Sequence, residues 1–145
     1  MIKPPKVIVN PAAGSGAAGR AWPGIEAKLR AALGEIDVVV TAHGGDETNL
    51  TRQGLEDGVH HFIAVGGDGT MNGVLNGIVA DGQPVNDQVR LSVVPAGTSN
   101  ELPRALGVHG DVDGAIAAIA AGGERRFDLL QADCLDLDHK DHRHY

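Results

Sequence analysis

The segment Val65-Gly66-Gly67-Asp68-Gly69-Thr70-Met71-Asn72 is a glycine-rich turn between two periodic patterns. The run before it, residues 61–65, is β-branched and aromatic and too short for a helix, which predicts a buried strand. Residues 70–78 place apolar side chains at helical spacing and predict a helix. A turn from a strand into a helix brings backbone N–H groups and a helix N-terminus towards one point, where they bind anions, usually phosphate. Glycines in such a turn let the ligand approach the backbone closely.

Asp68 is the unusual residue of this turn, because it places a carboxylate among groups that favour negative charge. Beside a phosphate it would be repelled unless a divalent cation bridges the two, or unless it accepts a proton from an attacking hydroxyl. Both arrangements are typical of phosphoryl transfer, and the sequence does not choose between them. Asp68 is therefore the candidate catalytic residue and the candidate ligand of a metal ion.

Short apolar segments alternate with helical patterns along the chain. Strands are expected at 6–9, 36–41, 61–65 and 90–95 and from Phe127, and helices from Trp22 to Leu33 and over 46–56, 70–78, 101–106 and 112–121. This alternation predicts an α/β fold of three layers, α/β/α, with a mainly parallel sheet covered on both faces. Because ligands bind at the carboxyl ends of such strands, residues 10–16, 41–46, 66–72 and 95–100 should form one site.

Length and composition limit the classes of protein. The chain has 145 residues, enough for one domain with a core, and its net charge of -7 argues against a nucleic-acid surface. The single Cys134 excludes an intrachain disulfide and favours a cytoplasmic location. The longest alanine-rich apolar segment, 115–121, is far shorter than the ~20 residues of a membrane-spanning helix.

Three blocks of sequence together resemble the diacylglycerol kinase catalytic domain family, which includes bacterial lipid kinases and sphingosine kinases. The blocks are Asn10-Pro11-Ala12-Ala13-Gly14, Gly66-Gly67-Asp68-Gly69-Thr70 with Asn72, and Pro95-Ala96-Gly97-Thr98-Ser99-Asn100. A single glycine-rich turn would be weak evidence, since unrelated phosphate sites use similar ones. Three blocks in the order of the family, each at a strand end, are a strong signal that spans nearly the whole chain.

The resemblance implies a Rossmann-like nucleotide-binding domain that transfers the γ-phosphate of ATP to a lipid hydroxyl, on diacylglycerol or a related lipid, with Mg²⁺. It also implies that the lipid is met peripherally at the membrane; a homodimer is a further expectation. The residues implied to hold the nucleotide are Asn10, Pro11, Gly14, Thr41, Gly66, Gly67, Asp68, Gly69, Thr70, Asn72, Gly97, Thr98 and Asn100. Asn100 could equally serve as a helix cap.

The chain departs from the family pattern at two positions and at its end. Glu101 stands where the lipid kinases usually have Asp, and Gly73 stands where many relatives have Glu. Residues 1–132 match the catalytic domain, whereas residues 133–145 are expected to begin a second, β-rich domain or to form a disordered tail. We therefore expect these 145 residues alone to have little activity. NAD kinase-like activity and a non-catalytic nucleotide-binding module stay open as alternatives.

Overall fold

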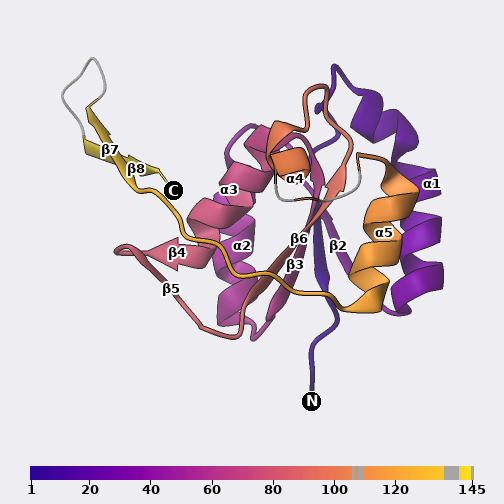
Figure 1. The fold of residues 1–145 in the computed structure, drawn as a ribbon, viewed down its shortest axis with the longest axis horizontal. Coiled ribbons are helices and arrows are strands. Elements are labelled where there is room, and N and C mark those ends of the chain that lie inside the picture. Colours follow the sequence, from indigo (N-terminus) through magenta and orange to yellow (C-terminus); the bar gives the residue numbers. More distant parts are fainter. Residues whose placement is uncertain (106, 108–109, 136–140, 145) are drawn as a thin grey trace.

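The computed structural model describes residues 1–105, 107, 110–135 and 141–144, and its centre is a four-stranded parallel sheet. The strands are β1 (Lys6–Val9), β2 (Asp37–Val40), β3 (His61–Gly66) and β6 (Arg90–Pro95). They lie in the order β2-β1-β3-β6, and each neighbouring pair is parallel. All four carboxyl ends therefore meet at one edge of the sheet, which is the upper edge in Figure 1.

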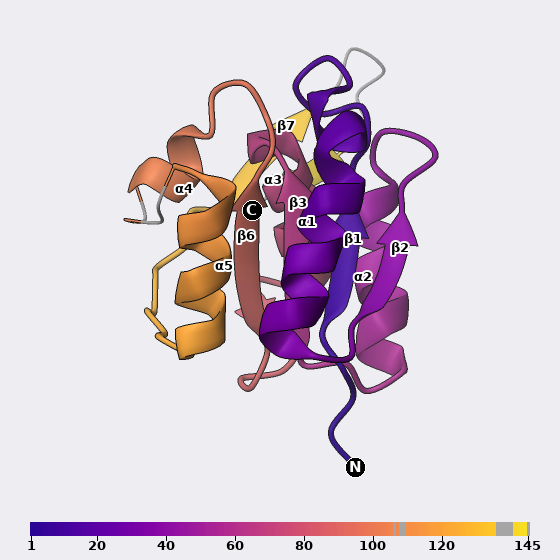
Figure 2. The ribbon, with the colours of Figure 1, turned by 90° about the vertical axis from the view of Figure 1, so that its right-hand side faces the viewer.

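Helices cover both faces of the sheet, as Figures 1 and 2 show. One face carries α1 (Ala17–Leu33) and α5 (Val112–Ala121), and the other carries α2 (Asp46–Glu56) and α3 (Asp68–Ile78). The short α4 (Glu101–Ala105) follows β6 at the carboxyl edge. The α/β fold of three layers with a parallel sheet, expected from the sequence, is thus confirmed.

The central strands β1 and β3 are apolar along most of their length because both of their faces are buried. Val7 and Val9 of β1 face one hydrophobic cluster together with Ile25 and Leu29 of α1, whereas Ile8 between them belongs to the cluster of α2 and α3. Strand β3 divides in the same way, with Ile63 and Val65 on the α1 side and Phe62 and Ala64 on the other. This alternation fixes the register of the central strands and so the position of the loops that follow them.

The first helix begins earlier than the sequence pattern predicts. It starts at Ala17, so that Pro23 lies inside it instead of in its first turn. A proline within a helix removes one hydrogen bond. The two alanines at the start have a high helix propensity, and Ala18 is fully buried against the core, which offsets that cost.

The strand expected from Phe127 is wrong. Residues 123–131 have no regular secondary structure, and the next strand, β7, spans Ala132–Leu135. Phe127 and Leu130 remain 48% and 93% exposed. A strand needs a partner that pairs its backbone and buries one of its faces, and this segment has no sheet partner among the described residues.

Two small hairpins lie outside the main sheet. One pairs β4 (Val79–Ala80) with β5 (Gln83–Pro84). The other pairs β7 with β8 (Asp141–His144) and stands apart from the body in Figure 1. Residues 136–140 and 145 lie outside the described residues, so the assignment of 133–145 to a second domain or a tail stays a prediction.

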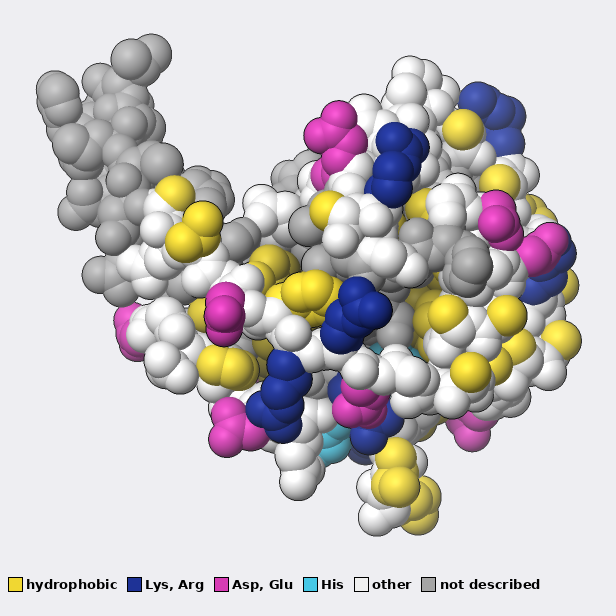
Figure 3. Space-filling model, viewed as in Figure 1, with side chains coloured by type: hydrophobic (Ala, Val, Ile, Leu, Met, Phe, Trp, Pro, Cys, Tyr) yellow, Lys and Arg dark blue, Asp and Glu magenta, His cyan; other side chains and the backbone are white. Residues whose placement is uncertain are grey.

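The surface in Figure 3 carries acidic and basic side chains that are interspersed, while hydrophobic side chains gather over α5. Those of α5 belong to alanines on its outer side, at 117, 118, 120 and 121. Within the described ranges, none of the helices is both long and apolar enough to span a membrane.

Candidate functional site

The loops after β1, β3 and β6 enclose a cavity of about 280 Å³ at the carboxyl edge of the sheet. Each of the three loops contributes small residues, which leave backbone groups at the surface of the cavity. The lining residues are Asn10, Ala13, Gly14, Gly67, Asp68, Gly69, Thr70, Gly97, Thr98 and Ser99. We call this space the glycine cavity. It brings together members of all three sequence blocks.

The glycine cavity depends on a backbone contact between the second and third blocks. A Cβ added at Gly97 would collide with the Cα of Gly67 and would lie 3.0 Å from the nitrogen of Gly67. The loop after β1 is almost as close, because a Cβ at Gly14 would lie 3.1 Å from the carbonyl oxygen of Ala96. The loops can therefore touch only because these positions carry no side chain.

Helix α3 begins at the floor of the glycine cavity with Asp68 as its first residue. The residue before it, Gly67, has no side chain with which to cap this end of the helix. The hydroxyl of Thr70 is buried and has no hydrogen-bond partner in the described structure. An unpaired buried hydroxyl costs free energy, so both features favour a polar ligand in this cavity.

Asp68 connects the turn after β3 to the loop after β6. Its Oδ2 accepts a hydrogen bond of 3.1 Å from the backbone N–H of Glu101, the first residue of α4. The carboxylate thus lies in the wall of the glycine cavity and is held from a second loop. This position suits either of the roles that the sequence leaves open for Asp68.

Asn100 does not cap a helix with its side chain. Its Oδ1 accepts from the N–H of Gly97, and its Nδ2 donates to the carbonyl of Gly97, so that the side chain closes the loop on itself. The backbone of Asn100 is left-handed, with φ of 48°, a conformation that Asn tolerates better than most residues. Its backbone carbonyl is the group that bonds to α4, by accepting from the N–H of Arg104.

A second and larger cavity of about 660 Å³ lies beside the first, between α2, α3 and the β4–β5 hairpin. We call it the side cavity. Asn10 and Gly69 line both cavities. The remaining lining residues are Gly44, Gly45, Glu47, Thr48, Arg52, Asn72, Gly73, Asn76, Val79, Ala80 and Asp81. Its volume lies within the ~300–1,000 Å³ of typical ligand pockets.

Glu47 in this wall is a residue that the sequence analysis missed. Only 3% of it is exposed, although it carries a charge. Its Oε1 accepts from Asn10 Nδ2 at 3.3 Å and its Oε2 from the N–H of Gly45 at 3.1 Å. The signal was present in the sequence, because Glu47 shares one face of α2 with the small, buried Thr51 and Gly54.

The departure at Gly73 has a structural explanation. A Cβ at Gly73 would lie 2.8 Å from the Cβ of Glu47, so that a side chain at position 73 and the stem of Glu47 cannot share this space. Thr48 adds a hydrogen bond of 2.8 Å from its hydroxyl to the carbonyl of Gly73. Helix α2 therefore packs directly on the backbone of α3.

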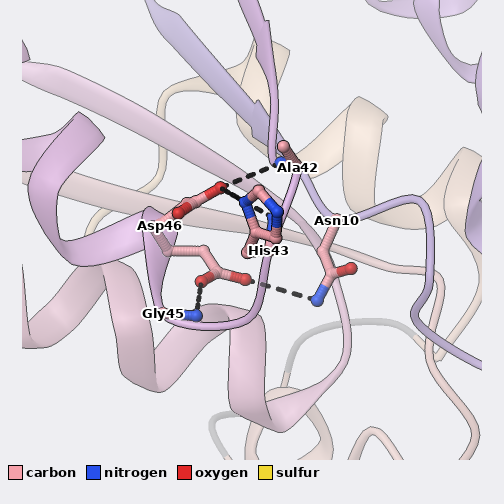
Figure 4. A network of polar contacts seen from close by, with 6 residues as sticks. Asn10, Ala42, His43, Gly45 and Asp46 are labelled. Atoms are coloured by element: carbon pink, nitrogen blue, oxygen red, sulfur yellow. Dashed lines mark hydrogen bonds and ion pairs between the residues drawn. The ribbon is translucent and has the colours of Figure 1, made fainter.

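The loop after β2 is shaped by Asp46, which Figure 4 shows beside Ala42 and His43. Hydrogen bonds from the backbone N–H groups of His43 and Ala42 hold the pKa of the Asp46 carboxyl below its ordinary value, and nearby His43 adds to this effect. The His43 side chain itself is 85% exposed and lines neither of the two cavities.

Nine of the thirteen residues proposed to hold the nucleotide line one of the two cavities, and four do not. Pro11 packs against α1, where its carbonyl accepts from the N–H of Gly19. Thr41 is 6% exposed and bonds to the carbonyl of Val9 through its backbone. Gly66 lies under the side chain of Thr70, and Asn100 shapes its own loop. These four support the walls instead of forming them, and whether the others bind a nucleotide stays a prediction.

Comparison with known proteins identifies the family to which the chain is related. The family described as "Diacylglycerol kinase catalytic domain" matches residues 4–132. A diacylglycerol kinase of Staphylococcus epidermidis is 37% identical over 129 residues, which are 89% of this chain and 40% of that protein. A diacylglycerol kinase of Staphylococcus saprophyticus is 36% identical over the same share of this chain and 41% of its own length.

A solved structure supports the same relationship. The crystal structure of a diacylglycerol kinase from Bacillus anthracis str. Sterne superposes with a TM-score of 0.70 and 30% sequence identity, covering 83% of this chain and 40% of that one. The chain spans about two fifths of the length of the curated relatives it matches. The three sequence blocks, the shared fold and the extent of the family match lead to one conclusion. The chain belongs to the diacylglycerol kinase catalytic domain family.

Proposed function

We propose that this chain is the nucleotide-binding part of an ATP-dependent lipid kinase, which transfers the γ-phosphate of ATP to a hydroxyl of diacylglycerol or a related lipid. The observation that carries the proposal is the contact between Gly67 and Gly97 above the N-terminus of α3, with Asp68 beside it. Backbone N–H groups and a helix N-terminus attract phosphate. A carboxylate beside a phosphate is functional only when it accepts the proton of the attacking hydroxyl or binds a cation that also binds the phosphate.

The two cavities divide naturally between the parts of ATP. The glycine cavity, with its backbone donors and the Thr70 hydroxyl, suits the phosphates. The side cavity has the volume for the nucleoside and includes the cation of Arg52. Asn10 and Gly69 line both cavities and would contact the nucleotide where its two parts join.

The residues also fit Mg²⁺, which would be bound with the phosphates. No cluster of three or more Asp, Glu, His or Cys forms a metal site in the part of the chain that the structure describes. Mg²⁺ commonly needs only one or two carboxylates when phosphate oxygens and water complete its shell. Asp68 would supply the carboxylate, and the ion would neutralise charge on the transferring phosphoryl group.

Phosphoryl transfer forms a bond between the lipid hydroxyl oxygen and the γ-phosphorus while the bond from that phosphorus to the bridging oxygen of ADP breaks. The hydroxyl proton must leave in the same event. Asp68 would accept it, or would hold the cation while the proton leaves by another route. The two roles differ in one measurable respect, because excess Mg²⁺ partly restores turnover in Asp68→Asn only if the carboxylate binds the ion.

We further propose that residues 1–145 alone bind ATP but transfer its phosphate slowly. A kinase must exclude water from the transferring group and hold the acceptor in line with it. A single sheet edge gives the lipid little enclosure, and the relatives have more than twice this length of chain. The lipid would be met peripherally, at the surface of a membrane.

The test is to incubate the protein, at its full natural length, with labelled ATP, Mg²⁺, a panel of lipids and NAD. Labelled phospholipid supports the proposal, and the panel identifies the acceptor. Labelled NADP would replace the proposal with NAD phosphorylation. Nucleotide binding with no labelled product from any acceptor would point to a non-catalytic module.

A further inference from the structure

The buried carboxylate of Glu47 needs an explanation, because charged residues are almost never fully buried unless they are paired. Among the described residues, no Lys, Arg or His forms an ion pair with it. Its position in the first turn of α2 is favourable, since the helix dipole stabilises negative charge there. The helix dipole explains why a charge is tolerated at this buried position. It does not explain why the carboxylate accepts two specific hydrogen bonds.

Those two bonds join loops that belong to different strands. Oε1 accepts from the side chain of Asn10, after β1, and Oε2 accepts from the backbone of Gly45, after β2. The stem of Glu47 packs on Gly73 of α3, which follows β3. Figure 4 shows Asn10 and Gly45 on opposite sides of this network. One side chain thus ties together the elements that follow three strands.

The chemistry of the carboxylate determines how the amide of Asn10 is oriented. An ionised carboxylate only accepts hydrogen bonds, so that Asn10 must present its Nδ2 to Glu47. The Oδ1 of Asn10 is then the atom that accepts from the N–H of Ala12, at 3.0 Å. Nδ2 carries two N–H groups and Glu47 takes one of them, so the amide in the shared wall of the two cavities offers a donor.

We propose that Glu47 is a positioning residue for nucleotide binding, which fixes the amide of Asn10 as a donor and holds the loop after β2 against the side cavity. The inference rests on the proposed function, because it takes the nucleotide as the occupant of these cavities. Glu47 acts through Asn10 and Gly45 and does not contact the reacting atoms.

A glutamine at this position cannot accept the same two hydrogen bonds, although its shape is nearly identical to that of glutamate. Glu47 receives two donors, from Asn10 and Gly45, whereas the amide introduced by Glu47→Gln would offer one acceptor and one donor. If the Asn10 amide reversed to match it, Nδ2 would face the N–H of Ala12 instead. Every arrangement therefore leaves one pair of donors facing each other.

The experiment measures the affinity for Mg-ATP and Mg-ADP by calorimetry, on the protein at its full natural length. We expect Glu47→Gln to weaken binding about tenfold, as a lost hydrogen bond to a charged group does. Glu56→Gln is the matched control, since it removes the same charge from the exposed far end of α2, and its affinity should equal that of the wild type. If Glu47→Gln fails to fold, Glu47→Asp keeps the charge but shortens the reach to Asn10, and the same loss is expected.

A double-mutant cycle separates positioning from a merely structural role. In an Asn10→Ala background, Glu47→Gln should weaken binding by less than about twofold, because the amide that Glu47 orients towards the nucleotide is gone and only its bond to Gly45 remains to be lost. Additive losses would overturn the inference, and so would wild-type affinity in Glu47→Gln while the unsubstituted protein binds ATP. If the unsubstituted protein binds neither nucleotide, the proposed function fails and this inference falls with it.

Discussion

The contact between Gly67 and Gly97 allows a quantitative test, in the variant Gly97→Ala. The added methyl group would collide with the Cα of Gly67 and would lie 3.0 Å from its nitrogen, where ordinary contacts begin near 3.4 Å. Backbone atoms on both sides cannot rotate away as a side chain can. The loops after β3 and β6 must therefore separate, and the cost of such overpacking is about 1–3 kcal/mol.

This cost appears in both stability and binding. For a chain of this size it lowers the melting temperature by about 2–12 °C. If the separated loops must close again on a nucleotide, the affinity for ATP falls by a further factor of about 5 to 150. Differential scanning fluorimetry gives the first number, and calorimetry on the folded variant below its melting temperature gives the second.

Gly24→Ala is the matched control, because it makes the same substitution at an exposed position of α1, where the new Cβ meets nothing within 4 Å beyond its own stretch of helix. Alanine is a better helix former than glycine, so we expect a gain of about 0.5–1 kcal/mol in stability and unchanged binding. A folded Gly97→Ala protein that binds ATP as tightly as the wild type would refute the reasoning, since the loops would then not need to touch.

Three further predictions concern other parts of the molecule. If the proposed kinase activity is present, Asp68→Asn should lower the turnover of the full-length protein by about 10²-fold or more in a labelled-ATP assay, since electrostatics supplies most of the catalysis of phosphoryl transfer. Near-normal turnover would remove Asp68 from the mechanism. Gly77→Ala should lower the free energy of unfolding by about 1–3 kcal/mol in urea, because its Cβ would lie 2.8 Å from the carbonyl oxygen of Thr48; unchanged stability would contradict the close packing of α2 on α3. Burial, reinforced by the charge of Arg90, holds the pKa of His61 below its ordinary value of 6.5, so the unfolded chain binds more protons and stability should fall as the pH drops below about 6.5. Melting curves at several pH values should show a smaller fall in His61→Gln, and an equal fall would assign the effect to other groups.

The sequence predicts the fold well where two faces of a strand are buried. The segments that form β1, β3 and β6 are apolar along most of their length. A continuous apolar run of only four to six residues is typical of a strand that is buried on both faces. The segment from Phe127 has the same kind of residues but is not a strand, because strand formation also requires pairing with another strand, and this segment has no sheet partner among the described residues. That condition depends on the whole sheet and cannot be read from a local stretch of sequence.

The residues of the candidate site also differ in how far a local stretch of sequence predicts them. The glycine blocks after β1, β3 and β6 are recognisable in sequence because a close backbone approach permits hardly any other residue. Glu47 escaped notice because the small residues on its face of α2 indicate only that this face packs closely against something. That α2 packs on α3 follows from the positions of Gly73 and Gly77 in space. Asn100 looked like a helix cap because its residue type suits one, but the left-handed backbone turns its side chain back onto Gly97.

The partition formed by Asn10 and Gly69 between the two cavities has a consequence for inhibitor chemistry. Two weak fragments, an anionic one for the glycine cavity and an uncharged one for the side cavity, would sit on either side of a wall only as thick as these residues. A short linker over that wall would make the second binding event intramolecular, at an effective concentration in the millimolar range. The affinity of the linked compound would then exceed the affinity of either fragment, without any new interaction with the protein.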